Sequence, residues 1–262
     1  MASPNDVLSA PCPICESSSP VRVSLKIFEV SRNLHQCPTC EAAFYSNPDW
    51  LDRAYSNVIN SLDTGIVERC FDLANVLTSF LSGHRGDVIL DFGGGIGLLS
   101  RIMRDRGFDF HSSDPMAEYR LPLPAPNDGP VAMATMIEVL EHLVDPLSEL
   151  REITTLTPTI FISTHLIPSS GLTADWPYLQ PQTGQHIFFC TPKTLRRIAD
   201  HLDMSVTSNG QNLHVLHRAP LSLRQRAFIK FQQPAWVFGH LASVSMRGRS
   251  LAESDALKAE GQ

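Results

Sequence analysis

The sequence predicts an α/β protein built around a doubly wound sheet, with a small cysteine-containing module before it. Three observations support this prediction. Strand-like apolar segments alternate with helix-like segments through the middle of the chain. One of these strands leads directly into a glycine-rich turn. Two C-x-x-C pairs lie near the N-terminus. We therefore expect a module over 1–48, a core domain over 49–218 and an extension over 219–262.

Length and composition limit the possible classes of protein. The chain has 262 residues, 43% of them hydrophobic, which is enough for one large core and a small satellite. A formal net charge of -6 gives no general attraction to nucleic acid. The N-terminus lacks the basic and then apolar pattern of a signal peptide, and no apolar run is long enough for a transmembrane helix. The expected location is the cytoplasm, with no nucleic acid as partner.

The first half of the core domain alternates helix and strand patterns. Apolar residues between 63 and 81 recur at steps of three and four, which is the spacing of one helix face. Val88-Ile89-Leu90 is a short apolar run typical of a buried parallel strand, and the glycine turn follows it. After the turn we expect a helix over 98–106 and strands over 109–113 and 131–136.

The second half continues this alternation and closes with a hairpin. The patterns predict a helix over 146–154, a strand over 159–165, a helix over 192–202, and strands over 204–207 and 213–217. Asn209-Gly210 is a common hairpin turn, so the last strand is expected to be antiparallel. The proline-rich stretch 121–126 suits neither strand nor helix. We therefore expect the usual third strand of such a sheet to be missing or replaced by a loop.

The glycine turn Asp91-Phe92-Gly93-Gly94-Gly95-Ile96-Gly97 lets a ligand approach the backbone closely. The dinucleotide fingerprint G-x-G-x-x-G would need glycine at 98, where this chain has leucine. Asp91 would serve a pyrophosphate poorly, but it suits a cofactor with an ammonium group. Asp114 ends the next strand and can accept hydrogen bonds from ribose hydroxyls, a feature that nicotinamide enzymes share.

Three ordered motifs resemble class I S-adenosylmethionine-dependent methyltransferases. Residues 88–97 are similar to the first motif of that family. Residues 136–146, which include Glu138-Val139-Leu140-Glu141-His142, resemble the segment after the fourth strand in one large bacterial branch. Gly184-Gln185-His186 and the residues up to Leu195 resemble a downstream motif of that branch. The resemblance covers roughly 60–218 and implies a Rossmann-like fold with S-adenosylmethionine as cofactor.

The resemblance also implies roles for particular residues. Asp114 would hold the ribose hydroxyls, and Glu138 would lie beside the cofactor at the end of the fourth strand. The methionine and ribose part would lie against the turn, whose residues are Asp91, Phe92, Gly93, Gly94, Gly95 and Gly97. No residue matches the usual position for adenine recognition.

Two histidines are candidates for catalysis. Methyl transfer from a sulfonium mainly requires the positioning of donor and acceptor, but an oxygen acceptor also needs a base. His142 and His186 follow strands on the expected ligand side, although each could equally be bonded to a backbone carbonyl. The loop 173–181 carries aromatic and acidic side chains that suit a polar ring. We expect a small polar acceptor, for example a sugar or a glycan precursor.

The four N-terminal cysteines predict a structural zinc site. Cys12-x-x-Cys15 and Cys37-x-x-Cys40 form two pairs separated by 21 residues, and four thiolates leave no coordination position open. A redox role is less favoured, because neither pair opens a helix. A zinc ribbon before such a core also resembles sugar methyltransferases of deoxysugar pathways, which have a long C-terminal domain that this chain lacks.

The extension interleaves basic and aromatic residues from 218 to 249. We favour its packing on the core over contact with a membrane surface, and we expect Pro234 to interrupt any helix there. The tail 253–262 is expected to fray.

Two other functions remain open. One is a nicotinamide-dependent oxidoreductase. The other is a non-catalytic, zinc-bearing protein that binds a partner and retains a vestigial cofactor fold.

Overall fold

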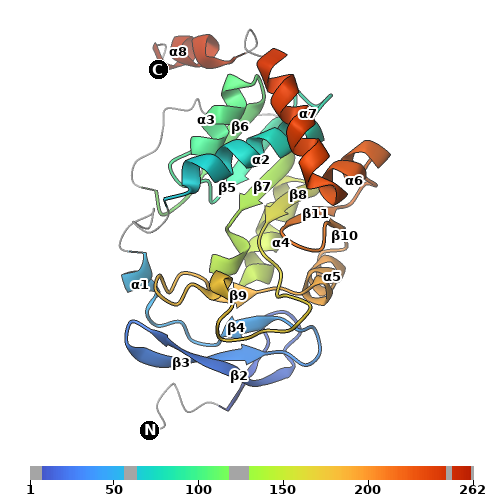
Figure 1. Cartoon of the computed structure of the whole chain (residues 1–262). Helices are drawn as coiled ribbons and strands as arrows, with labels where there is room; N and C mark the ends of the chain where they lie inside the picture. The colour runs from blue at the N-terminus through green and yellow to red at the C-terminus, as the bar shows by residue number, and fades with distance from the viewer. Residues whose placement is uncertain (1–7, 56–63, 118–129, 246–249, 261–262) are drawn as a thin grey trace.

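The computed structural model describes residues 8–55, 64–117, 130–245 and 250–260. Its strands form two sheets, with helices packed on both faces of the larger one (Figure 1). The smaller sheet has the order β1-β2-β3-β4-β9, and the larger has the order β10-β11-β8-β7-β5-β6. Within the described residues, no helix is long and apolar enough to cross a membrane.

The larger sheet is mainly parallel. Its strands are β5 (Val88–Phe92), β6 (Asp109–Ser113), β7 (Val131–Ile137), β8 (Thr159–Ser163), β10 (Ser205–Ser208) and β11 (Leu213–His217). β5 pairs in parallel with β6 and β7, and β7 with β8, whereas β11 runs antiparallel to both β8 and β10. The carboxyl ends of β5, β6 and β7 therefore meet at one edge. The expectation about a missing third strand concerns 118–129, which lie outside the described residues.

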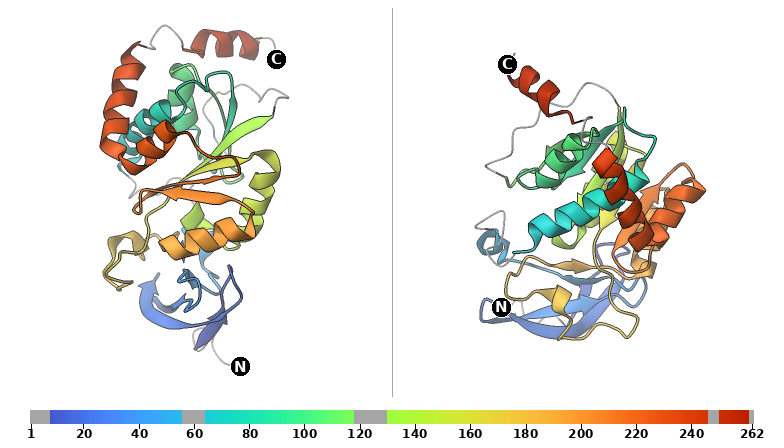
Figure 2. Two further views of the ribbon diagram at one scale, coloured as in Figure 1. Left: turned by 90° about the vertical axis from the view of Figure 1, so that its right-hand side faces the viewer. Right: turned by 45° about the horizontal axis from the view of Figure 1, so that its top comes forward.

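Helices cover this sheet on two faces (Figure 2). One face carries α2 (Ile66–Phe80), α3 (Leu98–Asp105), α6 (Leu223–Lys230) and α7 (Gln232–Ser245). The other carries α4 (Pro146–Leu156) and α5 (Pro192–His201). Both helices on this second face begin with a capped turn: Asp145 accepts from the Ser148 N–H, and Thr191 forms a capping box with Thr194.

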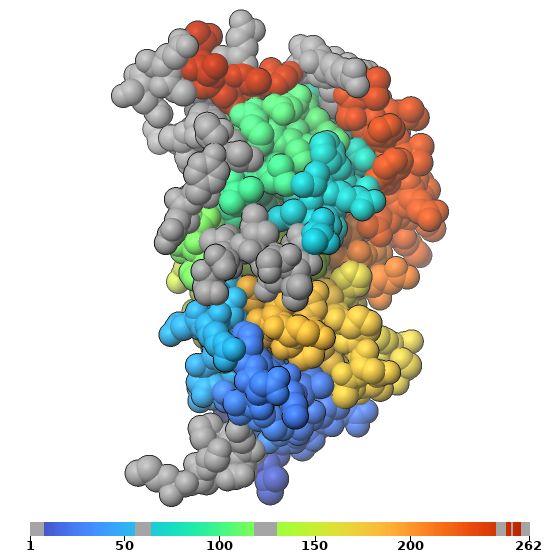
Figure 3. All heavy atoms as spheres, turned by 60° about the vertical axis from the view of Figure 1, so that its left-hand side comes forward, coloured from blue at the N-terminus to red at the C-terminus, as the bar shows by residue number. Residues whose placement is uncertain are grey.

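In the structure the N-terminal module extends past 48. It contains β1 (Ser9–Pro11), β2 (Ser18–Ile27), β3 (Val30–Gln36) and β4 (Ala43–Tyr45), and it ends with the short helix α1 (Leu51–Ala54). Its sheet continues into the core domain, because β4 pairs antiparallel with β9 (Phe188–Phe189). Figure 3 shows the blue N-terminal residues packed directly against the yellow and orange residues of the core. The sequence boundary at 48 thus separates two parts that share a sheet.

The C-terminal region corrects one expectation and agrees with another. Residues Ala252–Glu260 form α8 instead of fraying, because Asp255 accepts hydrogen bonds from the buried Arg104 guanidinium and from Arg101. Pro234 lies in the first turn of α7, where its missing N–H costs no helical hydrogen bond. As expected, no single helix runs through this segment: the break between α6 and α7 lies at Phe231, three residues before Pro234.

Candidate functional site

The glycine turn between β5 and α3 requires glycine at several positions for different reasons. Gly93, Gly95 and Gly97 have φ values of 67°, 55° and 82°, in the left-handed region that L side chains rarely adopt. Gly94 is limited by space, because an added Cβ would lie 2.5 Å from the Asp91 Oδ2 and the Ser112 Oγ. The turn therefore presents bare backbone at the edge of the sheet.

Two aspartates hold this turn from different sides. Asp91 is only 1% exposed, and its carboxylate accepts from the Thr135 Oγ1 at 2.7 Å and from the Ser100 Oγ at 3.0 Å. Burial raises the pKa of Asp91 to about 6. Asp114 follows β6 and accepts from the N–H groups of Gly95 and Met116, each at 2.8 Å. Asp91 thus supports the turn from beneath, and Asp114 lies at its edge.

The remaining two cofactor candidates, Phe92 and Glu138, end β5 and follow β7. Phe92 is partly buried against the hydrophobic core that α4 and α5 cover. Glu138 follows β7 with a φ of 53°, an unusual conformation for a residue other than glycine. Its carboxylate accepts from the Ser163 Oγ at 2.6 Å, and the Tyr178 hydroxyl oxygen lies 3.0 Å from its Oε2. Burial, followed by the neighbouring charge of Glu141, raises the pKa of Glu138 to about 7.

The two catalytic candidates lie together, next to a buried carboxylate. Glu141, His142 and His186 each offer one ligand atom, and these atoms lie within 4.8 Å of one another. The rings of His142 and His186 are 5.0 Å apart and nearly perpendicular. Burial lowers the pKa of both imidazoles, and that of His186 falls to about 3. Both rings are therefore neutral at physiological pH.

This cluster adjoins the glycine turn through Val139. A Cβ added at Gly93 would lie 2.7 Å from a methyl group of Val139, which is two residues before Glu141. The short 3₁₀ turn η2 (Leu140–His142) presents Glu141 and His142, and the loop before β9 presents His186. The cofactor candidates and the histidines therefore occupy one continuous region.

An aromatic wall borders the cluster. The Tyr178 ring, in the turn η3 (Pro177–Leu179), lies 4.6 Å from the His186 ring and 5.5 Å from Trp176. Its hydroxyl donates to Glu141, and also lies near Glu138. Glu141 lies in the sequence motif but was not singled out as a site residue. The one available signal was its position three residues after Glu138. Tyr178 could not be singled out within the 173–181 loop.

The four cysteines converge at the N-terminal module. The Cys12 and Cys40 sulfurs are 3.4 Å apart, and the Cys15 and Cys37 sulfurs are 3.5 Å apart. All four lie within 4.8 Å of one another. Tetrahedral zinc with Zn–S bonds of about 2.3 Å places its sulfurs about 3.8 Å apart, so this arrangement fits the ion. The hydrogen bond between Cys12 and Cys40 lowers the pKa of Cys12 and raises the pKa of Cys40, so it favours the thiolate at only one of these two sulfurs.

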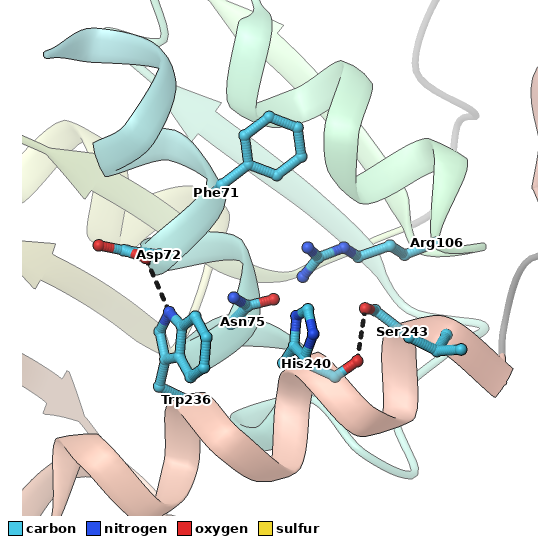
Figure 4. Close-up of a pocket in the computed structure, with 8 residues that line it drawn as sticks. Phe71, Asp72, Asn75, Arg106, Trp236, His240 and Ser243 are labelled. Atoms are coloured by element: carbon cyan, nitrogen blue, oxygen red, sulfur yellow. Dashed lines mark hydrogen bonds between the residues drawn. The ribbon is translucent and has the colours of Figure 1, made fainter.

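A separate pocket lies between α2 and α7 (Figure 4). Arg106 and His240 face each other across it. Part of its wall is paired internally, since the Trp236 Nε1 donates to Asp72 at 2.7 Å and the Trp236 ring stacks on His240, whereas the Asn75 Oδ1 has no hydrogen-bond partner within the described residues. These contacts fasten α7 to α2, and we assign the pocket no ligand.

Comparison with known proteins gives a family and several distant structural likenesses. A family model described as a methyltransferase domain matches residues 68–209. No curated protein sequence matches the chain.

Three solved structures illustrate the structural likenesses. The crystal structure of TnmH is 15% identical with a TM-score of 0.45, and the match covers 67% of this chain and 62% of TnmH. Magnesium protoporphyrin IX methyltransferase (ChlM) from Synechocystis PCC 6803 with bound SAM is 15% identical with a TM-score of 0.40, covering 65% and 90%. CalO1, a methyltransferase in calicheamicin biosynthesis, is 14% identical with a TM-score of 0.38, covering 55% and 54%. The chain thus spans less than two thirds of TnmH and about half of CalO1.

Proposed function

The chain belongs to the methyltransferase domain family, and on that premise we propose that it transfers a methyl group from S-adenosylmethionine to a small polar acceptor. The observation that carries the proposal is the glycine turn, whose bare backbone lies between Asp91 and Asp114. When bound, the cofactor supplies a methyl group already activated on a sulfonium, so the protein's task is to position donor and acceptor.

The turn residues divide the work of holding the cofactor. Gly93, Gly95 and Gly97 would offer backbone groups to the methionine and ribose part, and Asp114 would accept hydrogen bonds from the ribose hydroxyls. Gly94 and Phe92 shape the turn by close packing. Because both oxygens of Asp91 already accept hydroxyl hydrogen bonds, we assign it the support of the turn. Glu138 lies at the neighbouring strand end, on the side of the histidines.

We place the acceptor beside His142 and His186. Each ring donates its Nδ1 proton to a backbone carbonyl, so each Nε2 can accept a hydrogen bond from an acceptor hydroxyl. The low pKa of His186 suits orientation of that hydroxyl better than full removal of its proton. The nearby rings of Trp176 and Tyr178 favour a flat or sugar-like polar molecule.

We also propose a structural zinc ion held by Cys12, Cys15, Cys37 and Cys40. Backbone N–H groups of Ile14, Thr39 and Cys40 point at sulfurs of this group at 3.3–3.4 Å, as expected around thiolates. With all four positions filled by the chain, the ion would stabilise the module and take no part in methyl transfer.

The net charge of the chain and its exposed apolar side chains support proposals about its location and partners. A net charge of -6 supports a protein that does not bind nucleic acid, and we retain the cytoplasm as its location. Several apolar side chains of α6, of α7 and of the residue between them are exposed, namely Leu223, Phe231, Val237, Phe238, Leu241 and Val244. These exposed apolar side chains support a second proposed role for the C-terminal extension, which is contact with a membrane surface.

Calorimetric titration with S-adenosylhomocysteine tests the cofactor assignment. The parent protein is expected to bind, and Gly94→Ala is expected to lose at least about 10-fold in affinity, or about 1.4 kcal/mol, because its Cβ would collide with Asp91 and Ser112. Gly86→Ala is the matched control, since a Cβ there meets nothing within 4 Å.

Failure of the parent protein to bind would overturn the proposal. Binding of NADH instead would support the nicotinamide enzyme. Cofactor binding with no methyl transfer to a panel of sugars and phenols would support the non-catalytic alternative.

A further inference from the structure

We propose that Glu141, His142 and His186 form a binding site for a divalent transition-metal ion, distinct from the four-cysteine site. The ion would take up the two Nε2 lone pairs in place of the direct hydrogen bonds proposed above, and would itself bind the oxygen atom of the methyl acceptor. The geometry of these three residues by itself supports binding of the metal. Its contact with an acceptor rests on the proposed methyltransferase function.

The three residues converge from two separate segments. Glu141 and His142 come from η2, and His186 comes from the loop that precedes β9. A backbone hydrogen bond from the Ile187 N–H to the Glu141 carbonyl joins the two segments at 2.8 Å. One nitrogen or oxygen of each side chain lies within 4.8 Å of the others, a spacing that one central ion can span.

Hydrogen bonds fix both imidazoles in the tautomer that a metal needs. The Nδ1 of His142 lies 3.0 Å from the Gln185 carbonyl oxygen, and the Nδ1 of His186 lies 2.7 Å from the Tyr178 carbonyl oxygen. A carbonyl can only accept, so each Nδ1 carries the proton and each Nε2 keeps its lone pair. The Tyr55 hydroxyl, 2.8 Å from the Nδ1 of His142, can share that proton as a second acceptor. Metal-binding histidines in proteins are oriented in this way by a partner on the other ring nitrogen.

The third ligand is a buried carboxylate, and only one of its two oxygens accepts a hydrogen bond within the described residues. Glu141 is 1% exposed, its Oε1 accepts from the Tyr178 hydroxyl, and its Oε2 has no hydrogen-bond partner within the described residues. A buried acceptor without a partner is costly, and buried charges normally pair or coordinate metals. A cation between Glu141 and the two histidines would supply the missing interaction.

The ligand set indicates the class of ion. Two imidazole nitrogens and one carboxylate oxygen suit Mn²⁺, Fe²⁺, Co²⁺ or Zn²⁺, whereas Mg²⁺ and Ca²⁺ prefer oxygen ligands. Three ligands from the chain would leave coordination positions for an outside oxygen.

A bound hydroxyl would release its proton to water more easily, because the cation stabilises the resulting alkoxide or phenolate. That oxygen would then form the new bond to the methyl carbon. The S–CH3 bond breaks in the same step, and its electron pair stays on sulfur, so S-adenosylhomocysteine leaves neutral at that atom. The inferred acceptor class is therefore a hydroxyl compound able to coordinate the ion.

Titration of the zinc-loaded protein with Mn²⁺, followed by electron paramagnetic resonance, tests the site, since thiolates bind Mn²⁺ weakly. We expect one Mn²⁺ per chain beyond the zinc. Glu141→Gln and His186→Gln are each expected to weaken Mn²⁺ binding by at least about 10-fold. His84→Gln, at an exposed histidine, and Glu152→Gln, at an exposed position of α4, are the matched controls and should bind as the parent does.

S-adenosylhomocysteine binding by the same variants shows whether they remain folded, and it separates the two proposals. A parent protein that binds S-adenosylhomocysteine but no Mn²⁺, Co²⁺ or second Zn²⁺ would overturn the metal site and leave the methyltransferase proposal standing. A parent protein that binds Mn²⁺ but not S-adenosylhomocysteine would overturn the methyltransferase proposal and leave the metal site standing. Undiminished Mn²⁺ binding by a folded Glu141→Gln or His186→Gln variant would also overturn the assignment.

Discussion

At the scale of the residue, the buried carboxyl group of Asp91 lowers the stability of the folded protein when it ionises. Its carboxyl group lies under the glycine turn, where burial makes ionisation costly and raises its pKa from 3.8 to about 6. Hydroxyls of Thr135 and Ser100 compensate in part. The neutral acid therefore stabilises the fold below pH 3.8, and that contribution is lost as the pH rises through about 6.

The substitution Asp91→Asn should make this dependence visible. The amide side chain does not titrate, so the variant is expected to gain up to about 3 kcal/mol relative to the parent between pH 4 and pH 7. Urea unfolding of both proteins, without ligand, at steps across this range measures the difference. A difference that stays constant with pH would contradict the assignment.

At the scale of the element, α8 is held to α3 by a buried ion pair. The Arg104 side chain is 1% exposed and donates to both carboxylate oxygens of Asp255, at 2.7 Å and 2.6 Å. A third hydrogen bond goes to Asp109. The guanidinium thus depends on two acids, one of which lies about 150 residues away in the chain.

Asp255→Ala should release α8 and destabilise the protein by up to about 3 kcal/mol, because the buried guanidinium loses two of its four hydrogen bonds and one of its two acids. Ser254→Ala, at an exposed position on the same helix, is the control. Urea unfolding reports the stability, and limited proteolysis reports cleavage near the C-terminus. Equal protection of the two variants would show that the pair does not hold α8.

At the scale of the whole molecule, the N-terminal module positions the loop that carries His186, one residue of the candidate site. β9 completes the module's sheet and directly follows the loop that carries His186. Three hydrogen bonds tie the same region to the module: the Trp50 Nε1 to the Gly184 carbonyl, the Gln185 Nε2 to the Ala54 carbonyl, and the Thr194 hydroxyl to the Cys40 carbonyl. The proposed zinc ion would therefore stabilise one wall of the site.

Loss of that zinc should be felt far along the chain. Cys12→Ser is expected to lower the zinc content measured by elemental analysis. It should also speed hydrogen exchange at 188–189 by at least about 10-fold, because these two residues pair with β4. Cys70→Ser, on α2, is the control, and β5 and β7 serve as internal references. Faster exchange confined to 9–45 would refute the coupling.

Much of the core domain could be predicted from local patterns. The strands 109–113 and 213–217 have the predicted bounds, and α2 begins only three residues after its expected start at 63. Short apolar runs and capping residues determine such elements locally. α8 was missed, because its stability comes from the contact of Asp255 with Arg104 and leaves no local pattern.

The sequence by itself determined the family motifs, the glycine turn and the cysteine quartet, since each depends on residue types at fixed short spacings. The tertiary structure alone decided that β9 joins the N-terminal sheet and that His186 lies beside Glu141 and His142. It also decided that Glu141 is buried with one oxygen unpartnered among the described residues. These are contacts between segments more than forty residues apart, and chain folding, not local propensity, sets their distances.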